Sequence, residues 1–114
     1  MIYTITAIIR PHLIEAVSDA LHDLNLRGYT VTDCRGEGRH KAPVHSFRGS
    51  QYGHTLQPYV RIEMLVPEAQ LSEAVKAIQR AAFTGEIGDG KIFVTEVKEV
   101  VRIRTGEHGD IALT

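Results

Sequence analysis

Residues 84–94, TGEIGDGKIFV, combine residue types that can bind a phosphate group. The glycines of this stretch can present backbone N–H groups to an oxyanion, and Lys91 can add a positive charge. Gly85 to Lys91 also match the letters G-x-x-x-x-G-K that begin a Walker A motif. A Walker loop opens a helix and has Ser or Thr after the lysine, whereas this stretch runs into a strand-like segment and has Ile92 there. The sequence therefore excludes a P-loop hydrolase and leaves two interpretations: a phosphate nest of another architecture, or a turn in which Gly85 caps a helix.

A second cluster of positive charge lies near the end of the chain, in the segment VVRIR. Arg102 and Arg104 would lie on the same face of a strand, because side chains repeat every second residue. Two guanidinium groups that face one way favour an anion between them. A solvated strand edge is the alternative interpretation.

The chain as a whole has a formal net charge of −1 and no long run of one sign. This balance argues against a nucleic-acid ligand, so any anion site has to be local. Such a local cluster occurs again where Arg39 and Lys41 follow Gly36 and Gly38. Together the clusters predict convergence on a polyphosphate.

Hydrophobic periodicity predicts the elements that position these clusters. Alternating segments rich in β-branched residues predict strands at residues 2–10, 29–35, 59–66, 91–97 and 100–104. Apolar residues at helical spacing predict helices between Pro11 and Gly28 and over residues 68–83. The order predicts a single α+β domain over residues 1–114 with the ferredoxin-like (split βαβ) fold, an antiparallel sheet with two helices on one face. Apolar residues on both faces of the first strand predict that oligomerisation covers the other face.

A long polar segment, at about residues 37–58, separates the two middle strands. Loops of this length are uncommon in compact domains unless they have a function. The segment carries Phe47, Arg48 and Tyr52, which a passive linker would not need, so we expect a protruding functional loop rather than a disordered insertion.

Read in order, several stretches resemble the P-II family of nitrogen signal-transduction proteins: AIIRP, GYTVTDCRGEGR, FRGSQY, RIEMLVP, TGEIGDGKIFV and VVRIRTGE. The resemblance implies a ferredoxin-like homotrimer that binds ATP or ADP in its intersubunit clefts, with Mg²⁺ as a candidate companion ion. It also implies that the long segment is a T-loop that docks on a protein target, such as a membrane transporter, an enzyme or a transcription regulator.

The same resemblance implies the site residues. Gly88 to Lys91 would wrap the phosphates, and the C-terminal arginines and Arg39 would add charge. Thr30, Glu63 and Met64 would approach the base and ribose. Thr84 would lie near the nucleotide from the adjoining subunit. The implied nucleotide-site residues are Thr30, Gly36, Gly38, Arg39, Glu63, Met64, Thr84, Gly88, Asp89, Gly90, Lys91, Arg102 and Arg104. The implied effector and partner residues of the loop and its base are His40, Phe47, Arg48, Tyr52 and Tyr59.

Two departures from the family pattern lie at the base of the loop. Members that sense 2-oxoglutarate have glutamine and lysine where this chain has His40 and Tyr59. Mg²⁺ prefers oxygen ligands, and a neutral phenol cannot supply the charge of a lysine to a dicarboxylate. We therefore expect weakened or lost 2-oxoglutarate sensing. Tyr52 falls where some members are uridylylated, but its surroundings differ, so we expect a docking aromatic residue rather than a modified one.

The prediction is thus a cytoplasmic, non-enzymatic regulator, recruited to the membrane when its target is a transporter. Cys34 is the only cysteine, which suits a reducing compartment. Three alternatives stay open: a sensor of another effector such as bicarbonate in carbon metabolism or transport, a slow ATPase in which Asp89 orients a water, and a metal-binding trimer. His40, His45 and His54 would serve the last of these, but their spacing matches no common zinc site, so no metal held by these histidines is expected.

Overall fold

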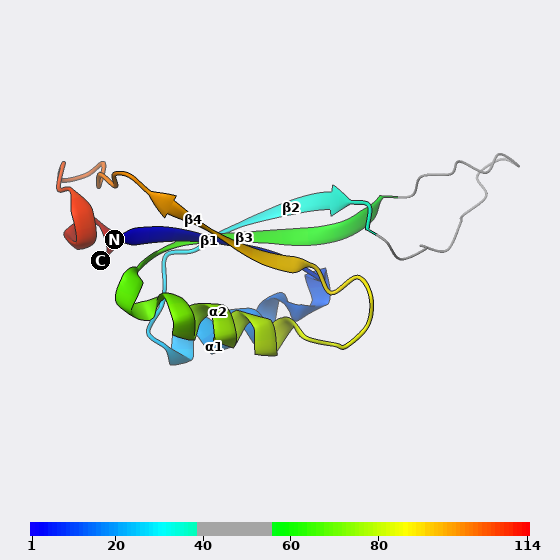
Figure 1. The fold of residues 1–114 in the computed structure, drawn as a ribbon. Helices are drawn as coiled ribbons and strands as arrows, with labels where there is room; N and C mark the ends of the chain where they lie inside the picture. Colours follow the sequence, from blue (N-terminus) through cyan, green and yellow to red (C-terminus); the bar gives the residue numbers. More distant parts are fainter. Residues whose placement is uncertain (39–55) are drawn as a thin grey trace, which may run out of the picture.

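Four antiparallel strands of the described chain form one sheet, and two helices cover one of its faces (Figure 1). The computed structural model describes residues 1–38 and 56–114. The elements in chain order are β1 (Ile2–Ile9), η1 (Pro11–Leu13), α1 (Ile14–Asp23), β2 (Thr30–Gly36), β3 (Gln57–Pro67), α2 (Glu68–Ala82), β4 (Lys91–Val97) and η2 (Gly109–Leu113). The strand order is β2-β3-β1-β4, and each neighbouring pair is antiparallel. This arrangement confirms the predicted α+β, ferredoxin-like fold.

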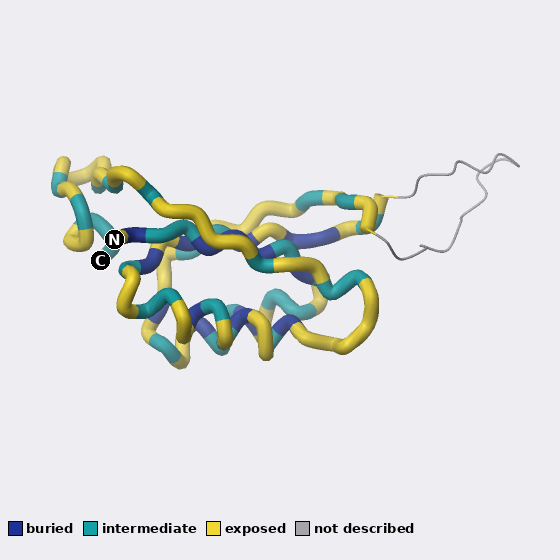
Figure 2. Tube along the Cα trace, in the orientation of Figure 1, coloured by how far each residue is buried: buried dark blue, intermediate teal, exposed yellow. Residues whose placement is uncertain are grey.

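The hydrophobic core lies between the sheet and the helices. Alternate residues of the central strands β1 and β3 face the helices, because side chains along a strand alternate between the two faces. Ile5 and Ile62 of these strands are 1% exposed, and Ile78 of α2 is 0% exposed. Figure 2 shows the buried positions along the central strands and on the helices. Burying a side chain of this size contributes about 1.5–3 kcal/mol, so the core holds the sheet firmly beneath its loops.

The helices are short, with 10 residues in α1 and 15 residues in α2. Within the described part of the chain, no helix has both the length and the apolar character needed to cross a membrane.

The predicted strand at residues 100–104 was wrong. Val101 makes only an isolated bridge to His108, and the residues between them form a turn. Gly106 and Gly109 have φ angles of 74° and 76°, a backbone conformation that favours glycine and folds the segment back on itself. Alternation alone suggested a strand, but these glycines close a local turn before the segment reaches the sheet.

Within the described residues, no helix covers the second face of the sheet. The register places Thr30 opposite Glu63, Glu63 opposite Thr6, and Thr6 opposite Phe93, so these four side chains share that face. Leu65 and Phe93 are 39% and 45% exposed. The two side chains leave apolar surface that a second copy of the chain would bury.

Candidate functional site

The loop between α2 and β4 is a tight turn in which glycine is required by geometry. Gly85, Gly88 and Gly90 have φ angles of 89°, 105° and 93°, which side chains other than glycine rarely adopt. At Gly90 a Cβ atom would lie 1.8 Å from the carbonyl oxygen of Ile8, so the loop packs directly on the end of β1. The backbone conformation therefore accounts for all three glycines, and their number alone is no evidence of a phosphate ligand.

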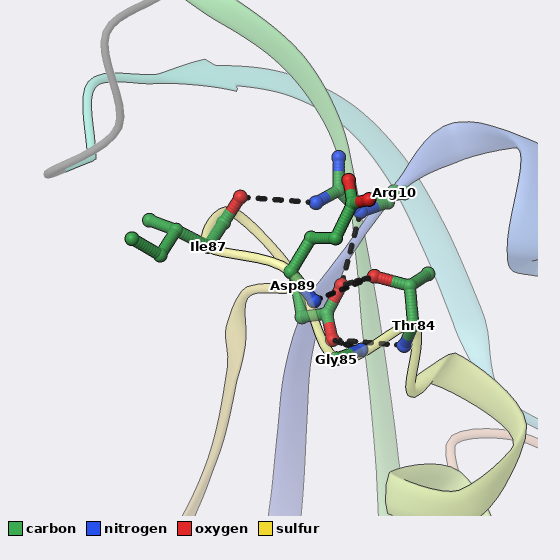
Figure 3. A network of polar contacts seen from close by, with 6 residues as sticks. Arg10, Thr84, Gly85, Ile87 and Asp89 are labelled. Atoms are coloured by element: carbon green, nitrogen blue, oxygen red, sulfur yellow. Dashed lines mark hydrogen bonds and ion pairs between the residues drawn. The ribbon is translucent and has the colours of Figure 1, made fainter.

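The carboxylate of Asp89 holds this loop together (Figure 3). It accepts hydrogen bonds from the backbone N–H of Thr84 (2.8 Å), the backbone N–H of Gly85 (3.0 Å) and the Thr84 hydroxyl. Arg10 Nε donates to the same carboxylate at 3.1 Å. Asp89 thus occupies the first amides of the loop from inside, so an external anion can use only the later amides and Lys91.

The same contacts keep Asp89 ionised. The side-chain and backbone hydrogen bonds from Thr84 hold the pKa of Asp89 well below its ordinary value, with further contributions from the Gly85 N–H and from Arg10. A carboxylate with so low a pKa is a poor general base, because proton abstraction works best when the pKa lies near the working pH. The geometry gives Asp89 the role of fixing the turn rather than of activating a water.

A cavity of about 720 Å³ joins this loop to the root of the long segment. Its volume is within the range of small-molecule sites. The residues that line it are Ile8, Gly36, Glu37, Gly38, Tyr59, Ile87, Gly88, Gly90 and Lys91. Asp89 instead lines a smaller hollow of about 410 Å³ between α2 and β4. The glycine loop and the glycines at the end of β2 therefore meet within one chain, whereas Arg39 and Lys41, the cations predicted beside those glycines, lie outside the described residues.

The third cluster lies at the opposite end of the sheet (Figure 1). Lys91 pairs with Ile8, whereas Val97, after which the C-terminal segment begins, pairs with Ile2. Six residues of strand at about 3.3 Å each separate the two ends by roughly 20 Å. Within a single chain, the C-terminal arginines therefore cannot contact an anion bound at Lys91.

The two C-terminal arginines also have different surroundings. Arg102 Nη1 lies 2.7 Å from Glu107 Oε1, and its Nη2 donates to the Thr114 hydroxyl at 3.1 Å and to the backbone carbonyls of Ile111 and Thr114. Arg104 is exposed in the turn and makes no ion pair with any described residue. The expected pair of guanidinium groups on one strand face is thus not formed.

The residues expected near the base and ribose lie on two different faces of the sheet. Thr30 and Glu63 are cross-strand partners on the helix-free face, where Glu63 also pairs with Arg61 at 3.1 Å. Met64 is 3% exposed and belongs to the core beneath the helices, so its side chain is not accessible to a ligand in this chain. Tyr59 is buried and lies next to Gly36 in the wall of the larger cavity.

Sequence reasoning missed Arg10. Its partner Asp89 is 79 residues away along the chain, and the only local sign was a basic residue at the end of the first strand, before Pro11. Its Nη2 also donates to the backbone carbonyl of Ile87 at 3.1 Å. Arg10 therefore connects the end of β1 to two points of the glycine loop.

Several predicted residues lie outside the described part of the chain: Arg39, His40, Lys41, His45, Phe47, Arg48, Tyr52 and His54. Over residues 1–38 and 56–114, no group of three or more His, Cys, Asp or Glu side chains is arranged to hold a metal ion.

Comparisons of the sequence and of the structure with known proteins point to the same family. Residues 2–107 match the family model "Nitrogen regulatory protein P-II". The chain is 49% identical to nitrogen regulatory protein P-II of Azospirillum brasilense and 43% identical to nitrogen regulatory protein GlnK of Escherichia coli, with 96% of this chain and 97% of each relative covered. It is also similar to the crystal structure of Arabidopsis thaliana PII bound to citrate, with a TM-score of 0.80, 40% identity, and coverage of 97% of this chain and 91% of that one.

Proposed function

The chain belongs to the nitrogen regulatory protein P-II family, and we propose that it is a regulator that binds ATP or ADP between the subunits of a homotrimer. P-II proteins are signalling regulators rather than enzymes. The T-loop, about residues 37–58, would act on a protein target in the cytoplasm, including a transporter at the membrane. The proposal that the protein regulates nitrogen metabolism rests on its membership of this family.

The observation that supports a site between subunits is the separation of the two positive charges, Lys91 and Arg104, within one chain. Lys91 and the cavity beside it lie at one end of β4, and Arg104 lies exposed in the segment that follows the other end. By the strand spacing, the two ends of β4 are roughly 20 Å apart. Neither end alone offers the charge that a triphosphate needs. A neighbouring copy that packs against the helix-free face would place its C-terminal turn beside Lys91, so each nucleotide site would be built from two copies.

The cavity also suggests how a nucleotide would reach the T-loop. Its wall continues from Gly88, Gly90 and Lys91 into Gly36 and Gly38, where the T-loop begins. An occupant that contacts Lys91 is therefore close to the root of the T-loop. ATP and ADP would favour different loop conformations if their contacts with this wall differ in free energy between those conformations.

The effector site at the loop base is altered. Tyr59 is buried beside Gly36, and its neutral phenol cannot pair with a carboxylate as a lysine would. We expect weakened or lost 2-oxoglutarate binding, with bicarbonate or another small anion as the alternative effector. A slow ATPase is disfavoured because the Asp89 carboxylate is fully engaged inside the loop.

Calorimetry of the purified protein with ATP, ADP and AMP, each with and without 2-oxoglutarate or bicarbonate, tests the proposal. We expect affinity to rise with the number of phosphates, little response to 2-oxoglutarate, and a trimer by light scattering. A monomer that binds no adenine nucleotide would refute the nucleotide-sensor function. Tight, ATP-dependent binding of 2-oxoglutarate would refute the altered effector site while leaving the nucleotide site in place.

A further inference from the structure

Arg10 connects two elements that are distant in sequence, beside the proposed phosphate site. It follows β1 directly and has an extended backbone, with φ −67° and ψ 138°, as expected before Pro11. Its carbonyl accepts a hydrogen bond from the Leu13 N–H at 3.1 Å, which anchors its backbone to η1. The side chain therefore starts from a well-held position.

The guanidinium group of Arg10 contacts two acceptors of the glycine loop (Figure 3). Nε donates to the Asp89 carboxylate and Nη2 to the Ile87 carbonyl, both at 3.1 Å. The Arg10 and Asp89 side chains are 25% and 23% exposed, so the pair is partly shielded from solvent. A planar guanidinium can make both contacts at once, whereas the ammonium group of a lysine is a single point charge on a flexible stem.

The charge of Asp89 makes this contact relevant to ligand binding. Asp89 lies between Gly88 and Gly90, both of which line the larger cavity, and it precedes Lys91. An ionised carboxylate without a cationic partner would oppose any anion bound at those amides, because like charges at short range repel. The positive charge of Arg10 offsets the negative charge of Asp89 and so reduces this repulsion. The hydrogen bond from Arg10 to the Ile87 carbonyl also fixes the orientation of that peptide group.

We propose that Arg10 is a positioning residue for the phosphate groups: it neutralises Asp89 and fixes the Ile87–Asp89 backbone so that the later loop amides and Lys91 face the cavity. The inference rests on the proposed nucleotide site. In this proposal Arg10 does not contact the ligand itself. The loss of affinity when Arg10 is replaced should therefore be larger for nucleotides with more phosphates, while contacts to the base stay unchanged.

The test compares Arg10→Lys, Arg10→Met and the double variant Arg10→Met/Asp89→Asn by calorimetry with ATP and AMP. Arg10→Met should weaken ATP binding about tenfold and AMP binding much less, the scale of one charge-assisted hydrogen bond. Arg10→Lys should fall between Arg10→Met and the unmodified protein. The double variant should regain part of the ATP affinity, because it removes the unpaired carboxylate.

Arg80→Met serves as the control, because Arg80 is an exposed arginine of α2. This control should change neither affinity. If Arg10→Met leaves the ratio of ATP to AMP affinity unchanged, or if the double variant binds ATP no better than Arg10→Met, the positioning role is refuted.

Amide hydrogen exchange of the nucleotide-free protein keeps the two proposals distinguishable. Arg10→Met should raise the exchange rates of the Thr84 and Gly85 amides, which donate to Asp89. If the unmodified protein binds no adenine nucleotide, the proposed function fails even when this exchange result is as expected. Unchanged exchange in Arg10→Met would contradict the loop-fixing role whatever the nucleotide result.

Discussion

At each end of the sheet an arginine forms an ion pair with an acidic residue. At the loop end Arg10 pairs with Asp89, and at the C-terminal end Arg102 pairs with Glu107. In both places an arginine shapes the backbone, and a neighbouring cation, Lys91 or Arg104, makes no ion pair with a described residue.

The ends differ in how completely the acidic partner is engaged. Asp89 accepts from two backbone amides, a hydroxyl and Arg10, which ties a short loop to the core. Arg102, rather than its acidic partner, is the hub at the other end, where it contacts Glu107, Ile111 and Thr114. The comparison teaches that an arginine in a ligand-like motif can already be paired within its own chain, while the cation next to it makes no ion pair with a described residue.

The largest expected effect is at the loop end, in Gly90→Ala. The added Cβ would meet the Ile8 carbonyl oxygen at 1.8 Å, and the φ of 93° is strained for alanine. We expect a loss of about 3 kcal/mol or more in the free energy of unfolding, measured by urea denaturation at fixed protein concentration.

Gly109→Ala is the matched control at the other end, because Gly109 has a φ of 76° but nothing within 4 Å of an added Cβ. It should cost only about 1–2 kcal/mol, the strain of the backbone alone. Equal losses in the two variants would show that the loop end is not packed on β1 as described.

A smaller effect on the free energy of unfolding is expected when the two C-terminal arginines are replaced, and it should differ between them. Arg102→Met should lower the free energy of unfolding by about 1–2 kcal/mol, the scale of charge-assisted hydrogen bonds reduced for partial exposure. Arg104→Met should change it by less than about 0.5 kcal/mol, as is usual for an exposed side chain. Urea denaturation measures both variants, and a larger loss for Arg104→Met would reverse the roles assigned to the two residues.

The smallest expected effect is that of mild acid on the hydrogen bonds of Asp89 in the loop between α2 and β4. Because the native pKa of Asp89 lies below its ordinary value of 3.8, its contribution to stability is complete above that value and is lost only as the pH falls through the native pKa. The Thr84 and Gly85 amide signals in an NMR pH titration should therefore hold steady from pH 7 down to pH 4. A midpoint at or above 3.8 would contradict the network around Asp89.

Much of the fold could be predicted from sequence because its elements carry strong local patterns. The alternation of Val60, Ile62, Met64 and Val66 predicted a strand with one buried face, and these four residues are in the core. The contact of Met64 with the base or ribose was inferred from resemblance alone and stays a prediction, because the alternation reports only that the side chain is buried within its own chain.

The site was less predictable because its contacts are long-range or depend on local turns. No pattern near Arg10 indicates a partner at Asp89, which approaches only after β1 and β4 have paired. Arg102 and Arg104 have strand-like spacing, but the glycine at 106 turns the chain before a strand forms. Sequence reasoning could thus propose charged residues for the candidate site but not show which of them are already paired within the chain.

The most direct test of the account mixes two defective variants, Lys91→Met and Arg104→Met. Each alone should bind ATP roughly 10- to 150-fold more weakly, the scale of one lost charged hydrogen bond. When the two are unfolded together and reassembled in equal amounts, about one site in four should combine an intact Lys91 with an intact Arg104 from different copies of a symmetric ring. We predict that calorimetry of the mixture recovers this fraction of high-affinity ATP sites. Reassembled trimers that show no recovery would contradict a nucleotide site shared between subunits.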